Sequence, residues 1–134
     1  MELNLRRFKK EDLETIEKWW EAWPDWKSPG EGFLPETGVV VTADGKLIMA
    51  AFIYLTNAKV ALMEWIISDP DYREDNRKQA LELLITGGEE VVKSLGYVFC
   101  FSICRSKKLG ETYKELGWHE DKEPSFEYVK ILNK

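Results

Sequence analysis

The residue in this chain best placed to move a proton is Glu64, a carboxylate within the apolar segment from Leu62 to Ser68. Met63 and Trp65 flank it, and apolar surroundings disfavour the ionised form of a carboxyl group. We therefore expect the pKa of Glu64 to be raised toward neutral pH, where a carboxylate serves well as a general base. The alternative is a structural residue that faces water or forms one half of an ion pair.

A second group of charged residues opens a predicted helix that follows this segment. The free N–H groups and the dipole at the start of a helix attract phosphate groups. Arg73, Arg77 and Lys78 add three positive charges at this helix start, whereas Glu74 and Asp75 add two negative ones. The pattern indicates an anion-binding helix start, and the alternative is a solvated charge cluster.

Tryptophans cluster around the end of the first predicted helix. The helical spacing places Trp20 and Trp23 on the core face and leaves Trp19 and Trp26 off that face. An exposed indole beside acidic residues would attract a cation through charge and through its π face. We expect Trp19 and Trp26 to contribute to a substrate site, and the alternative is packing within the loop.

Composition limits the classes of protein that need consideration. A chain of 134 residues with 44% hydrophobic residues predicts one domain with a buried core. The apolar runs are too short for a membrane span and the N-terminus lacks the apolar core of a signal peptide, so we expect a cytoplasmic protein. The net charge of -5 disfavours a nucleic-acid partner.

The few histidine and cysteine residues exclude some kinds of metal site. His119 is the only histidine, which excludes a metal site built from several histidines. Cys100 and Cys104 are the only cysteines, and their spacing does not match a zinc site. We expect both to be free, buried thiols.

Hydrophobic periodicity predicts an α/β domain with a mixed, mainly antiparallel sheet and helices on both faces. Asp44-Gly45 predicts a tight hairpin, and Gly87-Gly88 within a helix predicts a close approach of that helix to the sheet. The predicted strands are 3–8, 39–42, 47–55, 60–68, 97–103 and 125–131, and the predicted helices are 11–23, 76–95 and 106–116.

The segment from Glu64 to Trp118 resembles the acetyl-CoA-binding half of the GNAT acyltransferase superfamily. In that family a strand is followed by V-x-P-x-Y-R-G-x-G-x-G/A, a helix, a strand and then L-Y-x-x-L-G-F. Asp69-Pro70-Asp71-Tyr72-Arg73 and Thr112-Tyr113-Lys114-Glu115-Leu116-Gly117-Trp118 are similar to these two motifs. The order of elements matches across nearly the whole chain, but the pyrophosphate loop of this chain has no glycine.

The resemblance implies a role for each candidate residue. Glu64 would act on the acceptor amine, directly or through water, and Tyr113 would protonate the departing CoA thiolate. The backbone of Ile66, Ile67 and Ser68 would pair with the pantetheine arm.

The same resemblance places the CoA phosphates at the charged helix start. Arg73, Asn76, Arg77 and Lys78 would bind them in place of the missing glycine loop, and Lys107 and Lys108 are further candidates.

These observations lead to one predicted domain over residues 1–134 with a GNAT-like fold. The predicted function is transfer of an acetyl group from acetyl-CoA to a small-molecule or peptide amine. The alternative is a non-catalytic GNAT-like interaction module that has lost acetyl-CoA binding. We expect no nucleic-acid or membrane partner, and a homodimer remains open.

Overall fold

The computed structural model describes residues 2–24, 27–30 and 32–133, and its centre is a five-stranded sheet in the order β1-β2-β3-β4-β5. Neighbouring strands are antiparallel except β4 and β5, which run parallel. The strands are β1 (Leu3–Arg7), β2 (Gly38–Ala43), β3 (Lys46–Leu55), β4 (Val60–Ser68) and β5 (Phe99–Phe101).

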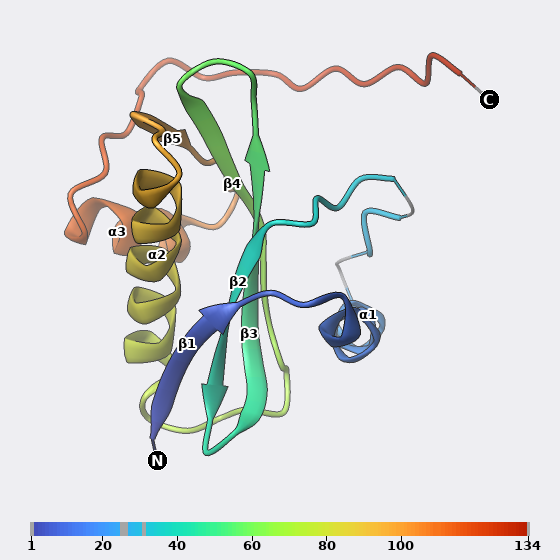
Figure 1. Ribbon diagram of the computed structural model, residues 1–134, viewed down its shortest axis with the longest axis vertical. Coiled ribbons are helices and arrows are strands. Elements are labelled where there is room, and N and C mark those ends of the chain that lie inside the picture. Colours follow the sequence, from blue (N-terminus) through green and yellow to red (C-terminus); the bar gives the residue numbers. More distant parts are fainter. Residues whose placement is uncertain (1, 25–26, 31, 134) are drawn as a thin grey trace.

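Helices cover both faces of this sheet, as Figure 1 shows. They are α1 (Leu13–Ala22), preceded by the short 3-10 helix η1 (Lys10–Asp12), α2 (Arg77–Ser94) and α3 (Lys107–Glu115). One core lies between α1 and the sheet, around Ile16, Trp20 and Phe52. The other lies between α2 and the sheet, around Met63 and Leu84. The predicted fold class, a mixed and mainly antiparallel sheet with helices on both faces, is confirmed.

Glycines allow two tight features of this fold. Asp44 and Gly45 both have positive φ angles, 49° and 83°, which produce the hairpin between β2 and β3. On α2, a Cβ atom added to Gly87 would lie 2.1 Å from the Leu5 side chain, and one added to Gly88 would lie 2.4 Å from the Met63 side chain. The predicted hairpin and the predicted close approach of helix to sheet are both confirmed.

The C-terminal prediction is wrong, because residues 125–131 form no strand in the structure. Phe126 and Tyr128 leave 81% and 90% of their surfaces exposed, so the segment lacks the neighbouring strand that would give it regular pairing. The prediction that both cysteines are buried is also wrong. Both are free, but Cys100 is half-buried and Cys104 is exposed. Within the described part of the chain, each helix is too short or too polar to cross a bilayer.

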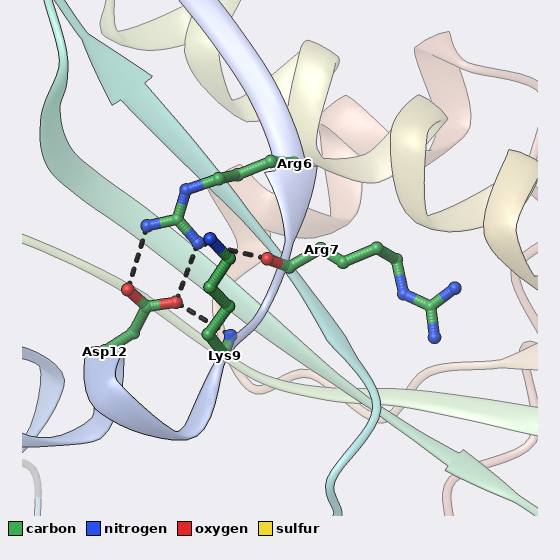
Figure 2. Close-up of polar contacts among 4 residues, drawn as sticks. All are labelled: Arg6, Arg7, Lys9 and Asp12. Carbon is green, nitrogen blue, oxygen red and sulfur yellow. Dashed lines mark hydrogen bonds and ion pairs between the residues drawn. The ribbon is translucent and has the colours of Figure 1, made fainter.

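An ion pair ties the end of β1 to the start of the first helical segment (Figure 2). The Arg6 guanidinium donates two hydrogen bonds to the Asp12 carboxylate, at 2.9 and 2.8 Å, and the Lys9 backbone N–H donates a third at 2.8 Å. The Arg6 hydrogen bonds hold the pKa of Asp12 below its usual value, against the opposing effect of burial. Asp12 therefore fixes the direction in which the chain enters α1.

We expect Asp12→Asn to lower the free energy of unfolding by about 2 kcal/mol at pH 7, because a charge-assisted pair becomes a weaker neutral one. Folding lowers the pKa of Asp12. The stability that its ion pair contributes is therefore present above the unfolded pKa of ~3.9 and is lost as the pH falls through the pKa of the folded state. Urea unfolding at pH 7 and at pH 3 measures it. Equal stability losses at both pH values would contradict the assignment to the ion pair.

Candidate functional site

The candidate site begins where β4 and β5 separate. The two strands pair from Val60 and Phe99 to Leu62 and Phe101, after which β4 continues to Ser68 while β5 ends. Glu64 lies just beyond the last pair. Its Oε1 accepts a hydrogen bond from the backbone N–H of Ile103 at 2.8 Å. The carboxylate thus bridges two chain segments that are no longer joined by strand pairing.

A β-bulge at Trp65 determines which side chains of β4 face the α1 core and which face the α2 core. Trp65 has a φ angle of 57°, and the pairing with β3 shifts so that two steps on β3 oppose three steps on β4. The extra residue reverses the alternation of side chains. Met63 and Ile66 both pack toward the α2 core, and Ile67 packs toward the α1 core. No residue pattern predicts this bulge, since tryptophan rarely adopts a positive φ angle.

Burial raises the pKa of Glu64 to about 7, and the charge of Glu127 adds to this effect. The hydrogen bond from the Ile103 N–H acts in the opposite direction because it stabilises the carboxylate. The structure therefore agrees with the expectation that the pKa of Glu64 is raised. A carboxylate of this kind exchanges its proton near neutral pH.

Tyr113 lies on α3 with its side chain almost fully buried. Its hydroxyl lies 2.7 Å from the hydroxyl of Ser102, and the centre of its ring lies 4.5 Å from that of Trp118. Burial raises the pKa of Tyr113, the Ser102 hydrogen bond opposes this effect, and the charges of Cys104 and Glu64 add to it. Tyr113 therefore keeps its proton at neutral pH. The sequence prediction missed Ser102, although Ser102 shares a strand-like alternation with the half-buried Cys100.

A pocket of about 590 Å³ lies between the end of β4, the start of α2, and α3. Five of the seven residues predicted to bind the cofactor line it: Ile66, Ile67, Ser68, Arg77 and Lys78. The other two, Arg73 and Asn76, are not among its lining residues. Asn76 instead accepts a hydrogen bond from the Tyr72 hydroxyl. Lys108 lines this pocket, while Lys107 lines a neighbouring one.

The charges around the pocket are mixed. Four acidic residues line it, Glu74, Asp75, Glu111 and Glu115, against three basic residues, Arg77, Lys78 and Lys108. Lys78 and Glu115 form an ion pair of 3.0 Å that joins α2 to α3, and Glu115 raises the pKa of Lys78. An anion that bound Lys78 would therefore have to compete with Glu115.

The predicted tryptophan site is corrected by the structure. Trp19 is only 4% exposed and packs in the α1 core, so the expectation that it lies off the core face is wrong. It is buried because the part of α1 that packs in this core is wide enough to include both Trp19 and Trp20. Trp26 lies outside the described residues. Trp23 instead reaches β4, where its Nε1–H donates a hydrogen bond of 2.9 Å to the carbonyl of Ser68. The role of Trp19 and Trp26 in substrate binding stays a prediction.

Because the folded pKa of Glu64 is raised, its contribution to stability is fully present below the unfolded pKa of ~4.3 and is lost as the pH rises through about 7. Glu64→Gln keeps an oxygen that can accept from Ile103 and cannot ionise. As the pH rises from 4.5 to 8, we expect the free energy of unfolding of this variant to increase by about 1 to 2 kcal/mol relative to that of the wild type, after allowance for solvent screening. Urea unfolding across this range measures it.

Glu90→Gln, at an exposed position on α2, is the matched control for the loss of one negative charge. A stability difference between Glu64→Gln and the wild type that does not change with pH would contradict the raised pKa.

Comparisons with known proteins identify the fold. No protein-family model matches the sequence, and no curated protein matches it either. Among solved structures, the ribosomal-protein-S18-alanine N-acetyltransferase from Escherichia coli is 18% identical, with a TM-score of 0.69 over 90% of this chain and 79% of that one. PaiA N-acetyltransferase from Thermoplasma acidophilum, in complex with coenzyme A, is 18% identical, with a TM-score of 0.66 over 92% and 94% of the two chains.

A third similar structure is an aminoglycoside acetyltransferase from an uncultured soil metagenomic sample, in complex with sisomicin. It is 13% identical, with a TM-score of 0.68 over 96% of each chain. This chain therefore has the fold of the GNAT acetyltransferases, and the fold that the sequence motifs implied is confirmed.

Proposed function

We propose that this protein is an N-acetyltransferase that moves an acetyl group from acetyl-CoA to an amine. The observation that carries the proposal is the arrangement where β4 and β5 separate. A carboxylate with a pKa of about 7, Glu64, and a protonated tyrosine, Tyr113, lie close enough there for the charge of one to affect the pKa of the other. Neither residue lines the pocket, but Ile66, Ile67 and Ser68 further along β4 and Thr112 next to Tyr113 do. A base for the amine and an acid for a thiolate are what this transfer requires.

The pocket fits coenzyme A in part. The edge of β4 beyond Leu62 has no pairing with β5, so the backbone there is available to an extended ligand arm. Arg77 and Lys78 lie at the start of α2, where the helix dipole also favours phosphate. Bound acetyl-CoA would supply the acetyl group as an activated thioester. The protein would position it and would provide the groups that accept and donate protons.

Each of the two proton-moving residues has a separate task in this proposal. Glu64 accepts the proton of the amine, directly or through a water molecule, because it is half ionised near pH 7. Tyr113 donates its proton to the sulfur leaving group, and the Ser102 hydroxyl holds the phenol in place. The acceptor would be a small-molecule or peptide amine.

One specific observation supports a second candidate, a non-catalytic interaction module with this fold. The loop before α2 has no glycine, and the acidic residues lining the pocket outnumber the basic ones. Both features weaken binding of a ligand that carries several phosphates. The two candidates differ in whether acetyl-CoA binds at all.

Acetyl-CoA binding distinguishes the two candidates. We expect acetyl-CoA at 100 times its Kd to add about 2.7 kcal/mol of stability, seen as a raised melting temperature. Arg77→Glu combined with Lys78→Glu should abolish this rise, because it removes the cations at the start of α2. Glu115→Gln should strengthen binding, because it releases Lys78 from its ion pair.

Lys93→Glu is the control for one of these two charge reversals, since it reverses one positive charge in the last turn of the same helix. It should leave the rise in melting temperature unchanged. The absence of any rise in the wild type at millimolar acetyl-CoA would reject the enzyme and favour the interaction module.

Once an acceptor has been found by screening polyamines, amino sugars and peptide N-termini, two variants separate the proton transfers. Tyr113→Phe should lower kcat by about 10²- to 10⁴-fold with little change in acetyl-CoA affinity, because the phenol acts mainly in the transition state. Glu64→Gln should lower kcat/KM and remove the rising limb of its pH profile near pH 7. Full activity in either variant would show that the residue is structural.

A further inference from the structure

Three aromatic residues lie together near Glu64, on the face of the sheet that α1 covers only in part. On β3, Phe52 lies in the α1 core, and Tyr54 comes next on the same face. The Trp65 Nε1–H on β4 donates a hydrogen bond of 2.7 Å to the Tyr54 hydroxyl. That hydroxyl in turn donates to the backbone carbonyl of Phe33. We call these three residues, Phe33, Tyr54 and Trp65, the aromatic cluster.

Glu64 faces the same side of the sheet as the aromatic cluster. It stands opposite Phe52 in the pairing of β3 with β4, so the two side chains share the α1 face. Burial raises the pKa of Tyr54, the Trp65 hydrogen bond opposes this effect, and the charge of Glu64 adds to it. Residues 32–37 also lie on the α1 side of the sheet (Figure 1). The carboxylate therefore has aromatic neighbours on the face opposite to the α2 core.

The position of Glu64 determines the side from which an acceptor amine reaches it. The pocket that would hold the cofactor lies between the end of β4, the start of α2, and α3, and Glu64 is not among its lining residues. An amine that gives its proton to Glu64 must therefore approach from the α1 face. On that face the body of the acceptor contacts the aromatic cluster.

The donors of the aromatic cluster are already paired within it. The Trp65 indole and the Tyr54 phenol have one donor each, and both donors are used in the cluster. Phe33 and Trp65 remain 50% and 38% exposed, so the cluster presents ring surfaces to the solvent. Ring surfaces attract apolar groups and cations. A sugar-like acceptor would lose water from its hydroxyl groups here without gaining hydrogen bonds from these donors in return.

We propose, on the basis of the proposed function, that the aromatic cluster selects the acceptor and that the acceptor is a primary amine on an aromatic or other apolar group. The ammonium form of such an amine is drawn to the Glu64 carboxylate, and its apolar body packs on the rings of Phe33 and Trp65. An arylalkylamine such as 2-phenylethylamine combines both parts. An amino sugar such as glucosamine has the amine without the apolar body.

Binding of amines to the full chain without acetyl-CoA tests this assignment separately from turnover. In ligand-observed NMR titrations, 2-phenylethylamine should bind at least about 10-fold more tightly than glucosamine, because it buries apolar surface on the rings. Phe33→Ala and Trp65→Ala should each weaken this binding by about 3- to 10-fold. Phe33→Ala changes a half-exposed loop residue, so its effect does not depend on the strained backbone at Trp65.

Leu55→Ala is the matched control for these two variants. Leu55 is 41% exposed and follows Tyr54 directly, but alternation places it on the opposite face of β3. Its removal should leave the binding of both amines unchanged.

Tyr54→Phe tests the role of the paired donors. It keeps the ring but frees the Trp65 indole N–H and the Phe33 carbonyl to bind hydroxyl groups. The preference for 2-phenylethylamine over glucosamine should therefore fall by about 3-fold or more. A general loss of stability would weaken the binding of both amines and leave this ratio unchanged.

The peptides Phe-Gly-Gly and Ser-Gly-Gly, compared in the same titrations, distinguish a peptide N-terminus from a small amine as the source of the apolar group. The apolar member of the pair that fits the site should bind more tightly. Equal binding within both pairs, or an effect of Leu55→Ala as large as that of Phe33→Ala, would overturn the assignment.

The titrations also separate this assignment from the proposed function. Acetyl-CoA binding without a preference for apolar amines would overturn the assignment and leave the proposed function standing. A preference for apolar amines without acetyl-CoA binding would reject the proposed function and leave the aromatic cluster as an amine-binding surface.

Discussion

A single extra residue in β4, at Trp65, controls the geometry of the candidate site. Without it, strict alternation would place Ile66 on the same face as Glu64 and would put Ile67 in the α2 core. With it, Ile66 reaches the pocket beside α2, while Glu64 stays on the other face, next to the gap between β4 and β5. This arrangement requires Trp65 to adopt a strained backbone conformation with a positive φ angle.

The gap between the strands and the hydrogen bond across it support each other. Parallel pairing of β4 and β5 stops after Leu62, which frees the backbone N–H of Ile103 to bind a side chain instead of a strand. Glu64 takes that position, and its carboxylate is thereby partly desolvated. The same separation leaves room for α3 to bring Tyr113 against Ser102. Glu64 and Tyr113 thus both make their contacts where the sheet is interrupted.

The sequence predicted those parts of the molecule that depend on local pattern. The bounds of β4, the hairpin at Asp44-Gly45 and the glycine contacts of α2 follow from periodicity and from backbone freedom. The raised pKa of Glu64 followed from its apolar neighbours. Contacts between distant segments could not be predicted in this way. Glu64 and Ile103 are 39 residues apart, and Lys78 and Glu115 lie on two different helices, so both contacts depend on how distant segments come together. The bulge at Trp65 depends on strain that tertiary packing imposes.

The two glycines of α2 also restrict how the pocket can respond to a ligand. Gly87 lies against Leu5 of β1 and Gly88 against Met63 of β4, so the middle of the helix is seated on strands from opposite parts of the sheet. A tilt or slide of α2 would move its backbone against these two side chains, because the glycines have no side chain of their own to take up the movement. The start of α2 is therefore a fixed wall of the pocket. α3 is joined to it by an exposed ion pair, so we expect α3 to be the wall that moves if the pocket widens.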